Sequence, residues 1–219
     1  MNRGERTGNL AGHEHRTVTW TSNRRFDLER RRRVADMSLE EMRLALLTSE
    51  VTGLPNRRAF DEAGPCPVIA LCDLDGLKAL NKYGYAVGDA ILRANARALL
   101  DAGVEAYHDK GDEFLCRASD LDDLRVRLEC ASTILRHLAV QVHLPSGSTL
   151  RICGADFSYG IGSTFVDAER QLRSQKRERE ARGEVARGQL CGISVSAEEL
   201  RGEVLNADFS SGAVTFVTA

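Results

Sequence analysis

One apolar run, Val68–Cys72, constrains the fold more than any other part of the sequence. It leads directly into the acidic segment Asp73–Asp75. A short continuous run of this kind is typical of a central strand that is buried on both faces. The sequence therefore predicts a sheet whose central strand ends in carboxylates.

Further strands and helices alternate along the chain. Glu105–Arg117 reads as two short strands around Asp109–Asp112, a hairpin. A second hairpin is predicted from Ala139–Leu144, the turn Pro145–Ser148 and a strand over Thr149–Ile161. Apolar spacing and helix-start signals predict helices at 37–47 (opened by a capping box of Ser38 and Glu41), Ala90–Leu100, 121–137 and Ala168–Arg182. This order favours an α+β sheet domain.

The chain length fits one domain with terminal extensions. The 219 residues are 42% hydrophobic, enough for one substantial core. We expect the domain at 48–188, preceded by the leading helix at 37–47. Residues 1–36 are polar and rich in arginine, without a sustained hydrophobic period, and we expect a mobile leader there. Residues 189–219 form a C-terminal extension to which the sequence assigns no role.

Charge and hydropathy exclude several partner classes. The formal net charge is −2, so no overall positive field favours nucleic acid or an anionic membrane as the main partner. No apolar run approaches the roughly 20 residues that span a bilayer, and the N-terminus lacks a signal-peptide segment. We therefore expect a cytoplasmic protein.

Four segments resemble one family in order and spacing. Thr52–Phe60, Asp73–Leu92, Gly111–Phe114 and Ser158–Lys176 are similar to the motifs of the GGDEF domain of diguanylate cyclases. The resemblance implies a palm-like nucleotidyl cyclase fold, with a central, mainly antiparallel sheet flanked by helices. It also implies condensation of two GTP to cyclic di-GMP with release of pyrophosphate.

The resemblance assigns the catalytic centre to Asp73, Asp112 and Glu113. These acids, with the Leu74 carbonyl, would bind two divalent ions per site, Mg²⁺ or Mn²⁺. Attack of a 3′-hydroxyl on an α-phosphate requires charge neutralisation on the attacking and leaving oxygens, and hard oxygen ligands suit magnesium. The alternative is that these are ordinary turn and strand-end acids. For Asp75, local hydrogen bonding is favoured over metal binding.

The family pattern places recognition of the base at Asn81 and Asp89. A carboxylate accepts hydrogen bonds from guanine N1–H and the exocyclic amine, whereas adenine offers no matching pair of donors. The structural alternatives are a helix N-cap for Asp89, before Ala90, and a plain turn residue for Asn81.

Phosphate contacts fall by position to Lys78 and Lys176, although Lys176 is also explained as one of many solvated cations on a charged helix. The arginine that the pattern expects four residues after Lys176 is Glu180 here. Arg179 or Arg182 can replace it on a helical face.

The signature departs from the family at its first glycine, which is Lys110. In a two-residue type II turn Lys110 would take the first central position and Gly111 would supply the positive φ, so we expect the hairpin to survive. The departure bears on how closely phosphates approach Gly111, and the Lys110 ammonium offers a phosphate contact instead.

Other departures surround the site. Ser49 replaces an aspartate, and His108 replaces an arginine two residues before the signature. The loop Asn81–Gly84 is one residue short, and the inhibitory RxxD motif is absent from Asp101–Val104. We therefore expect no product feedback through that motif.

Three functions remain open at this stage. The first is a diguanylate cyclase, which needs a homodimer because each domain would contribute one GTP. The second is a cyclase with another nucleotide product. The third is a catalytically idle GGDEF module that binds GTP or a protein partner. A regulatory protein could act through the leading helix.

Overall fold

The computed structural model describes residues 17–20, 36–144, 149–184, 192–198 and 214–218. Most of the expected leader and the turn Pro145–Ser148 lie outside the described residues. Within the described part, no helix is long and apolar enough to cross a membrane.

The predicted central strand is confirmed. β2 (Val68–Leu74) lies between β4 (Glu113–Ala118) and β7 (Phe157–Gly162), and β3 (Glu105–Lys110) pairs with the free side of β4. All pairings in this four-stranded sheet are antiparallel. Both neighbours of β2 run antiparallel to it. The first residues of β4 and β7 therefore lie beside the last residues of β2, where Asp73 is found.

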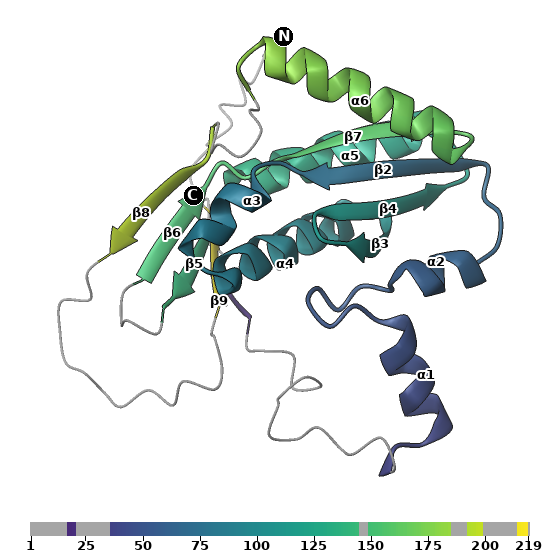
Figure 1. Cartoon of the computed structure of the whole chain (residues 1–219), viewed down its shortest axis with the longest axis horizontal. Helices are drawn as coiled ribbons and strands as arrows, with labels where there is room; N and C mark the ends of the chain where they lie inside the picture. The colour runs from purple at the N-terminus through teal and green to yellow at the C-terminus, as the bar shows by residue number, and fades with distance from the viewer. Residues whose placement is uncertain (1–16, 21–35, 145–148, 185–191, 199–213, 219) are drawn as a thin grey trace, which may run out of the picture.

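The two faces of β2 pack against different helices. Ala70 and Cys72 join the large core cluster with residues of α4 and α5, whereas Ile69 joins a smaller cluster with Ala168 of α6. Figure 1 shows α6 along β7 and β2. The helices packed on the sheet are α2 (Arg57–Glu62), α4 (Tyr85–Asp101), α5 (Leu121–His137) and α6 (Phe165–Ala181).

Two glycines of β7 determine how close α6 lies to the sheet. A Cβ built on Gly160 would stand 2.1 Å from the Ala168 carbonyl oxygen, and one on Gly162 would stand 2.7 Å from the Ala168 nitrogen. Only glycine permits this approach of helix backbone to strand backbone. The contact brings the C-terminal half of α6 over the end of β2.

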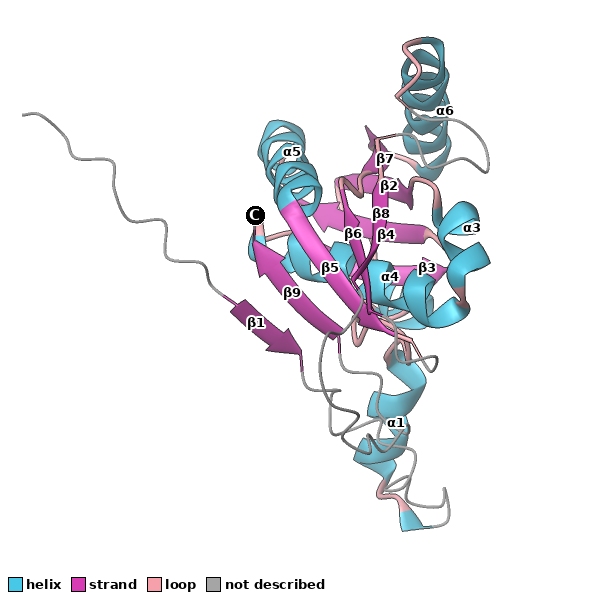
Figure 2. Ribbon diagram, turned by 90° about the vertical axis from the view of Figure 1, so that its left-hand side faces the viewer, coloured by secondary structure: helices cyan, strands magenta, loops and turns pink. Residues whose placement is uncertain are grey.

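A second, five-stranded sheet includes parts of both terminal regions (Figure 2). Its order is β1-β9-β5-β6-β8, all antiparallel. β5 (Leu138–His143) and β6 (Thr149–Cys153) form the expected hairpin. The edge strands are β1 (Thr17–Trp20) and β8 (Ser194–Glu198), and β9 (Val214–Thr218) lies between β1 and β5. Parts of the leader and of the C-terminal extension therefore pair with the domain.

The single strand expected over Thr149–Ile161 is wrong. The chain leaves β6 at Gly154, whose φ is 77°, and re-enters a different sheet as β7. A Cβ on Gly154 would stand 2.2 Å from the Gly192 carbonyl oxygen, so this glycine permits both the bend and the approach of the segment before β8.

The helix starts agree only in part with the sequence. α1 (Leu39–Leu47) has the predicted capping box at Ser38. α4 begins at Tyr85 rather than Ala90, after the short α3 (Leu77–Leu80) and the 3₁₀ turn η4 (Asn81–Tyr83). Asp89 is thus inside α4, and its alternative assignment as an N-cap is wrong.

Candidate functional site

The catalytic acids expected from the sequence lie at the end of β2 that faces α6. Asp73 and Glu113 are directly opposed cross-strand partners in β2 and β4, and opposed residues point to the same face of a sheet. The Lys176 ammonium of α6 lies 2.5 Å from Asp73 Oδ1. Asp112 is held beside them, because the Leu74 N–H donates to its carbonyl oxygen at 2.9 Å.

The electrostatics of Asp73 reflect this crowding. Burial raises its pKa above the ordinary value, Lys176 lowers it, and the charges of Asp112 and Glu113 raise it. Like charges at close range disfavour ionisation of each other, and a cation relieves that cost. The acid cluster is therefore a place where positive charge is stabilising.

The signature turn differs from its expected geometry. Lys110 is the last residue of β3 and pairs with Glu113, so Gly111 and Asp112 form the turn. The positive φ, 55°, falls on Gly111 as expected, but the placement of Lys110 at a central turn position is wrong. The exposed Lys110 ammonium lies 3.6 Å from Glu113 Oε2, at the rim of the acid cluster.

Asp75 has the local hydrogen-bonding role that the sequence favours. Ser158 Oγ donates to both carboxylate oxygens at 3.0 and 3.1 Å, and Arg179 Nη1 donates to Oδ2 at 2.8 Å. Arg179 Nη2 also binds Asp156 at 2.8 Å, and its Nε lies 3.4 Å from Glu184. These contacts favour a structural role for Arg179 over the predicted phosphate contact.

The residues expected to read the base lie near one another. The Asn81 side chain covers Gly88, where an added Cβ would stand 1.9 Å from Asn81 Oδ1, and Asp89 follows in α4. Asp89 is half-buried, with Arg93 at 3.9 Å. Lys78 is exposed on α3. Their roles toward a nucleotide stay predictions.

A hollow of about 430 Å³ opens beside the acids, between α6 and the β2–β4 pair. It contains side chains that the sequence interpretation missed, including Arg57 and Phe165, whose guanidinium and ring lie 5.0 Å apart. Helical spacing from Lys176 gives the signal for most of them, because one face of α6 repeats every three or four residues. The α6 residues in the hollow are Phe165, Glu169, Leu172, Arg173 and Lys176.

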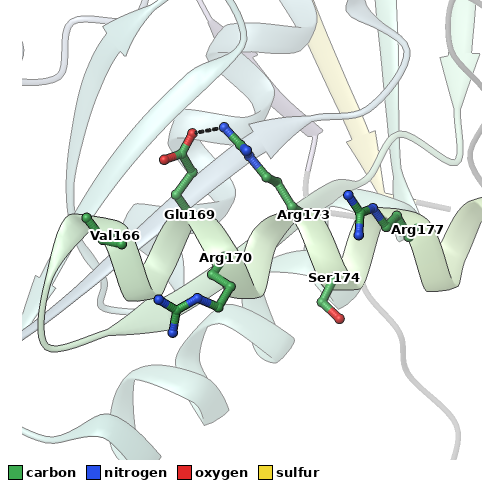
Figure 3. A pocket seen from close by; sticks show the side chains of 6 residues that line it. All are labelled: Val166, Glu169, Arg170, Arg173, Ser174 and Arg177. Carbon is green, nitrogen blue, oxygen red and sulfur yellow. Dashed lines mark hydrogen bonds and ion pairs between the residues drawn. The ribbon is translucent and has the colours of Figure 1, made fainter.

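A second hollow, of about 410 Å³, lies on the outer side of α6 (Figure 3). Its arginines are partly neutralised: Arg173 pairs with Glu169 at 2.5 Å, and Arg170 pairs with Asp167 at 3.4 Å. Neither hollow includes Asn81 or Asp89.

The donor chemistry of the acid cluster fits a divalent cation. Carboxylates and a backbone carbonyl are the ligands that Mg²⁺ prefers, and the mutual repulsion around Asp73 favours added positive charge. In the described part of the chain, however, no three acidic, histidine or cysteine side chains are gathered tightly enough to hold an ion. Lys176 holds Asp73 in this arrangement.

Comparison with known proteins identifies the fold. No protein-family model matches the chain. Among solved structures it is similar to the diguanylate cyclase SiaD of Pseudomonas aeruginosa, solved in complex with its activator SiaC. The identity is 27%, the TM-score is 0.51, and the match covers 64% of this chain and 63% of that one.

Two curated proteins are also similar. Identity is 40% over 93 residues (35% of this chain) to an uncharacterised protein in the hutH 5′ region of Streptomyces griseus. It is 28% over 174 residues (69% of this chain) to the cyclic di-GMP phosphodiesterase PdeR of Escherichia coli K12. The match spans only 39% and 25% of their respective lengths.

The antiparallel sheet with its flanking helices is the fold of GGDEF domains, which confirms the predicted fold class. The four sequence motifs agree with this likeness to a diguanylate cyclase structure.

Proposed function

We propose that this chain is a diguanylate cyclase that condenses two GTP into cyclic di-GMP and releases pyrophosphate. The observation that carries the proposal is the meeting of Asp73 and Glu113 at opposed positions of neighbouring strands, with Asp112 in the adjoining turn. A phosphoryl-transfer centre needs such a cluster of carboxylates beside an open hollow.

The proposed division of labour follows from where the side chains lie. Asp73, Asp112, Glu113 and the Leu74 carbonyl would hold Mg²⁺ or Mn²⁺. Bound divalent ions would neutralise charge on the attacking and leaving oxygens. Lys176 is already at the acid cluster, and its ammonium can transfer from Asp73 to an incoming phosphate.

Selection of the substrate's base would depend on residues at and after the C-terminal end of α3. Asn81 and Asp89 would bind the guanine edge, since the Asp89 carboxylate is partly exposed and matches two guanine donors. Lys78 and the rim residues Lys110 and Gly111 would contact phosphate oxygens.

Incubation of the purified chain with GTP and Mg²⁺, followed by mass spectrometry of the products, tests the proposal. We expect cyclic di-GMP from the wild type and at least a hundredfold less from Asp112→Ala, about the effect of removing one preorganised charge-stabilising group. Asp122→Ala, which removes an 86% exposed carboxylate on α5, is the matched control and should keep full activity.

One observation favours the idle module as second candidate. Asp73 is paired with a lysine, and no three ligand side chains of the described residues are gathered for an ion. GTP binding without turnover, at concentrations where the protein is dimeric, would support this candidate and contradict the cyclase. Appearance of another cyclic or linear nucleotide would instead support a different product.

We also propose that the active species is a homodimer. The described residues of one copy form this one acid cluster, which would hold one GTP, so joining two GTP would require two facing copies. Sedimentation with a non-hydrolysable GTP analogue should show the dimer. Because SiaD was solved with its activator SiaC, a regulatory protein that promotes dimerisation is a reasonable partner class.

A further inference from the structure

His108 occupies an unusual position behind the signature turn. Its side chain is buried on the face of the sheet opposite to Asp73, and its ring stacks on Phe114, with centroids 4.9 Å apart and planes at 26°. Both ring nitrogens have polar contacts: Nδ1 lies 2.7 Å from Ser49 Oγ, and Nε2 lies 3.1 Å from the Gly111 carbonyl oxygen. The histidine therefore bridges two segments that are distant in sequence.

The chemistry of the partners determines which nitrogen carries the proton. A carbonyl oxygen only accepts, so Nε2–H must donate to Gly111. Burial lowers the pKa of His108, while the charges of Asp109 and Asp89 raise it. In the neutral ring Nδ1 is an acceptor, and the Ser49 hydroxyl must donate to it.

Ser49 is itself fixed in the loop between α1 and α2. Its oxygen accepts from the Thr52 N–H at 3.3 Å, and its N–H donates to the Leu54 carbonyl at 2.8 Å. The same loop is bonded to α1 through Asn56 N–H to the Leu47 carbonyl, at 2.8 Å. A continuous series of bonds thus runs from the end of α1 to His108.

The turn beyond His108 has two anchors on its main chain. The Leu74 N–H holds the Asp112 carbonyl at 2.9 Å, and His108 holds the Gly111 carbonyl. Gly111 itself has no side chain that could add contacts, and a Cβ there would meet nothing within 4 Å. Loss of the histidine contact would leave the Gly111 side of the turn without this anchor.

We propose that Ser49 and His108 are positioning residues, which hold the Gly111–Asp112 turn in place and couple it to the loop that follows α1. The two substitutions relative to the GGDEF pattern, Ser49 and His108, are then one joint change rather than two separate losses. The effect on turnover rests on the proposed cyclase function, whereas the effect on the turn does not.

The first test measures the turn without any substrate. In ¹⁵N spectra of the imidazole we expect His108 protonated at Nε2 in the wild type. Ser49→Ala should shift the Nδ1 resonance and speed amide hydrogen exchange of residues 111–114 at least fivefold, about 1 kcal/mol at 1.4 kcal/mol per tenfold. Ser49→Thr, which keeps the hydroxyl, should stay near the wild type.

Ser119→Ala, an exposed serine after β4, is the matched control and should change neither readout. His108→Phe preserves the stacking on Phe114 but removes both bonds, and Ser49→Ala should add nothing in that background. Wild-type exchange rates and imidazole resonances in Ser49→Ala, or fully additive effects in the double variant, would overturn the proposal.

The second test applies once the wild type makes product. Ser49→Ala should lower kcat about fivefold with little change in KM for GTP, because the pair touches the turn and not the nucleotide. A change confined to KM would contradict a positioning role. If the wild type makes no product, the proposed function fails while the exchange experiment still decides the role of the pair.

Discussion

Two carboxylates at the end of β2, Asp73 in the strand and Asp75 just after it, have different surroundings because α6 passes over both. Asp73 meets Lys176 and remains partly open to the hollow, while Asp75 meets Arg179 and is buried. Lys176 and Arg179 are three residues apart on the helix, a spacing that places both on the face toward β2. The helix register therefore separates a site acid from a structural acid.

The buried Asp75 gives a pH dependence of stability with a definite sign. Burial raises its pKa from 3.8 to about 6, and the attraction of Arg179, which also serves Asp156, only partly offsets this. A carboxyl with a raised pKa in the folded state contributes stability below pH 3.8 that is lost as the pH rises through about 6.

We therefore expect the free energy of unfolding of the wild type, relative to Asp75→Asn, to fall between pH 4 and 6.5 by up to roughly 3 kcal/mol. Urea denaturation at several pH values measures it, with the exposed Asp122→Asn as control. If this difference instead grew with pH, the Arg179 ion pair would outweigh burial.

At this scale the sequence identified the acids but not their partners. Asp73, Asp112 and Glu113 are recognisable because they stand in segments that resemble the GGDEF motifs, Asp73 after an apolar run and the other two at the start of a predicted strand. The pairing of Arg179 with Asp75 spans 104 positions and depends on the register of α6 against β2, which no local pattern encodes.

Among the elements, α6 is positioned by the absence of side chains on β7. Gly160→Ala places a methyl group 2.1 Å from the Ala168 carbonyl oxygen and 2.2 Å from the Leu172 nitrogen, both backbone atoms. We expect the free energy of unfolding to fall by at least about 1–3 kcal/mol, because backbone atoms cannot move aside as a flexible side chain can. The rate of amide hydrogen exchange in α6 should rise as the stability falls.

Ser163→Ala, an exposed position just after β7, is the control and should have little effect. Wild-type exchange throughout α6 in Gly160→Ala would show that the helix is not held by this contact.

The helix α4 carries a buried polar side chain without a hydrogen-bond partner among the described residues. Asn95 of α4 is fully buried, and within the described residues neither its Oδ1 nor its Nδ2 has a hydrogen-bond partner. Asn95→Leu, which keeps the number and branching of the side-chain heavy atoms, should raise the free energy of unfolding by about 1–3 kcal/mol. Urea denaturation, with the free energy of unfolding extrapolated to zero urea, provides the measurement.

The matched control is another asparagine, Asn56, whose side chain caps α2 by accepting from Arg58 and Ala59 N–H. Asn56→Leu should lose about 1 kcal/mol. Destabilisation by both substitutions would mean that Asn95 has a partner, for example an ordered water.

Element positions were predictable where periodicity is strong and failed at glycines. Helix 121–137 was predicted with the observed bounds because its apolar face is continuous. The start of α4 was placed five residues late, since Gly84 rather than a polar side chain precedes it. The break at Gly154 was missed because the contact that requires it comes from Gly192.

At the scale of the whole molecule, the C-terminal end of the domain can be tested. The sequence predicted this end at residue 188, yet Ile193 is 9% exposed and part of the main core cluster. Ile193→Ala should cost about 2–4 kcal/mol, whereas Ser194→Ala, on an exposed neighbour, should stay within about 0.5 kcal/mol. Equal, small effects in urea denaturation would show that residues 192–198 do not contribute to the core.

The pairing of β1 with β9 has a mechanical consequence. Thr17 lies opposite Val217 and Trp20 opposite Val214, so the first residue of β1 and the last residues of β9 lie at the same end of their ladder. A pulling force applied at residues 17 and 218 would load the bonds between these strands in turn, as in a zipper, rather than all at once in shear. Tension on the two terminal strands would thus detach β1 from β9 before it strains the sheet that carries Asp73.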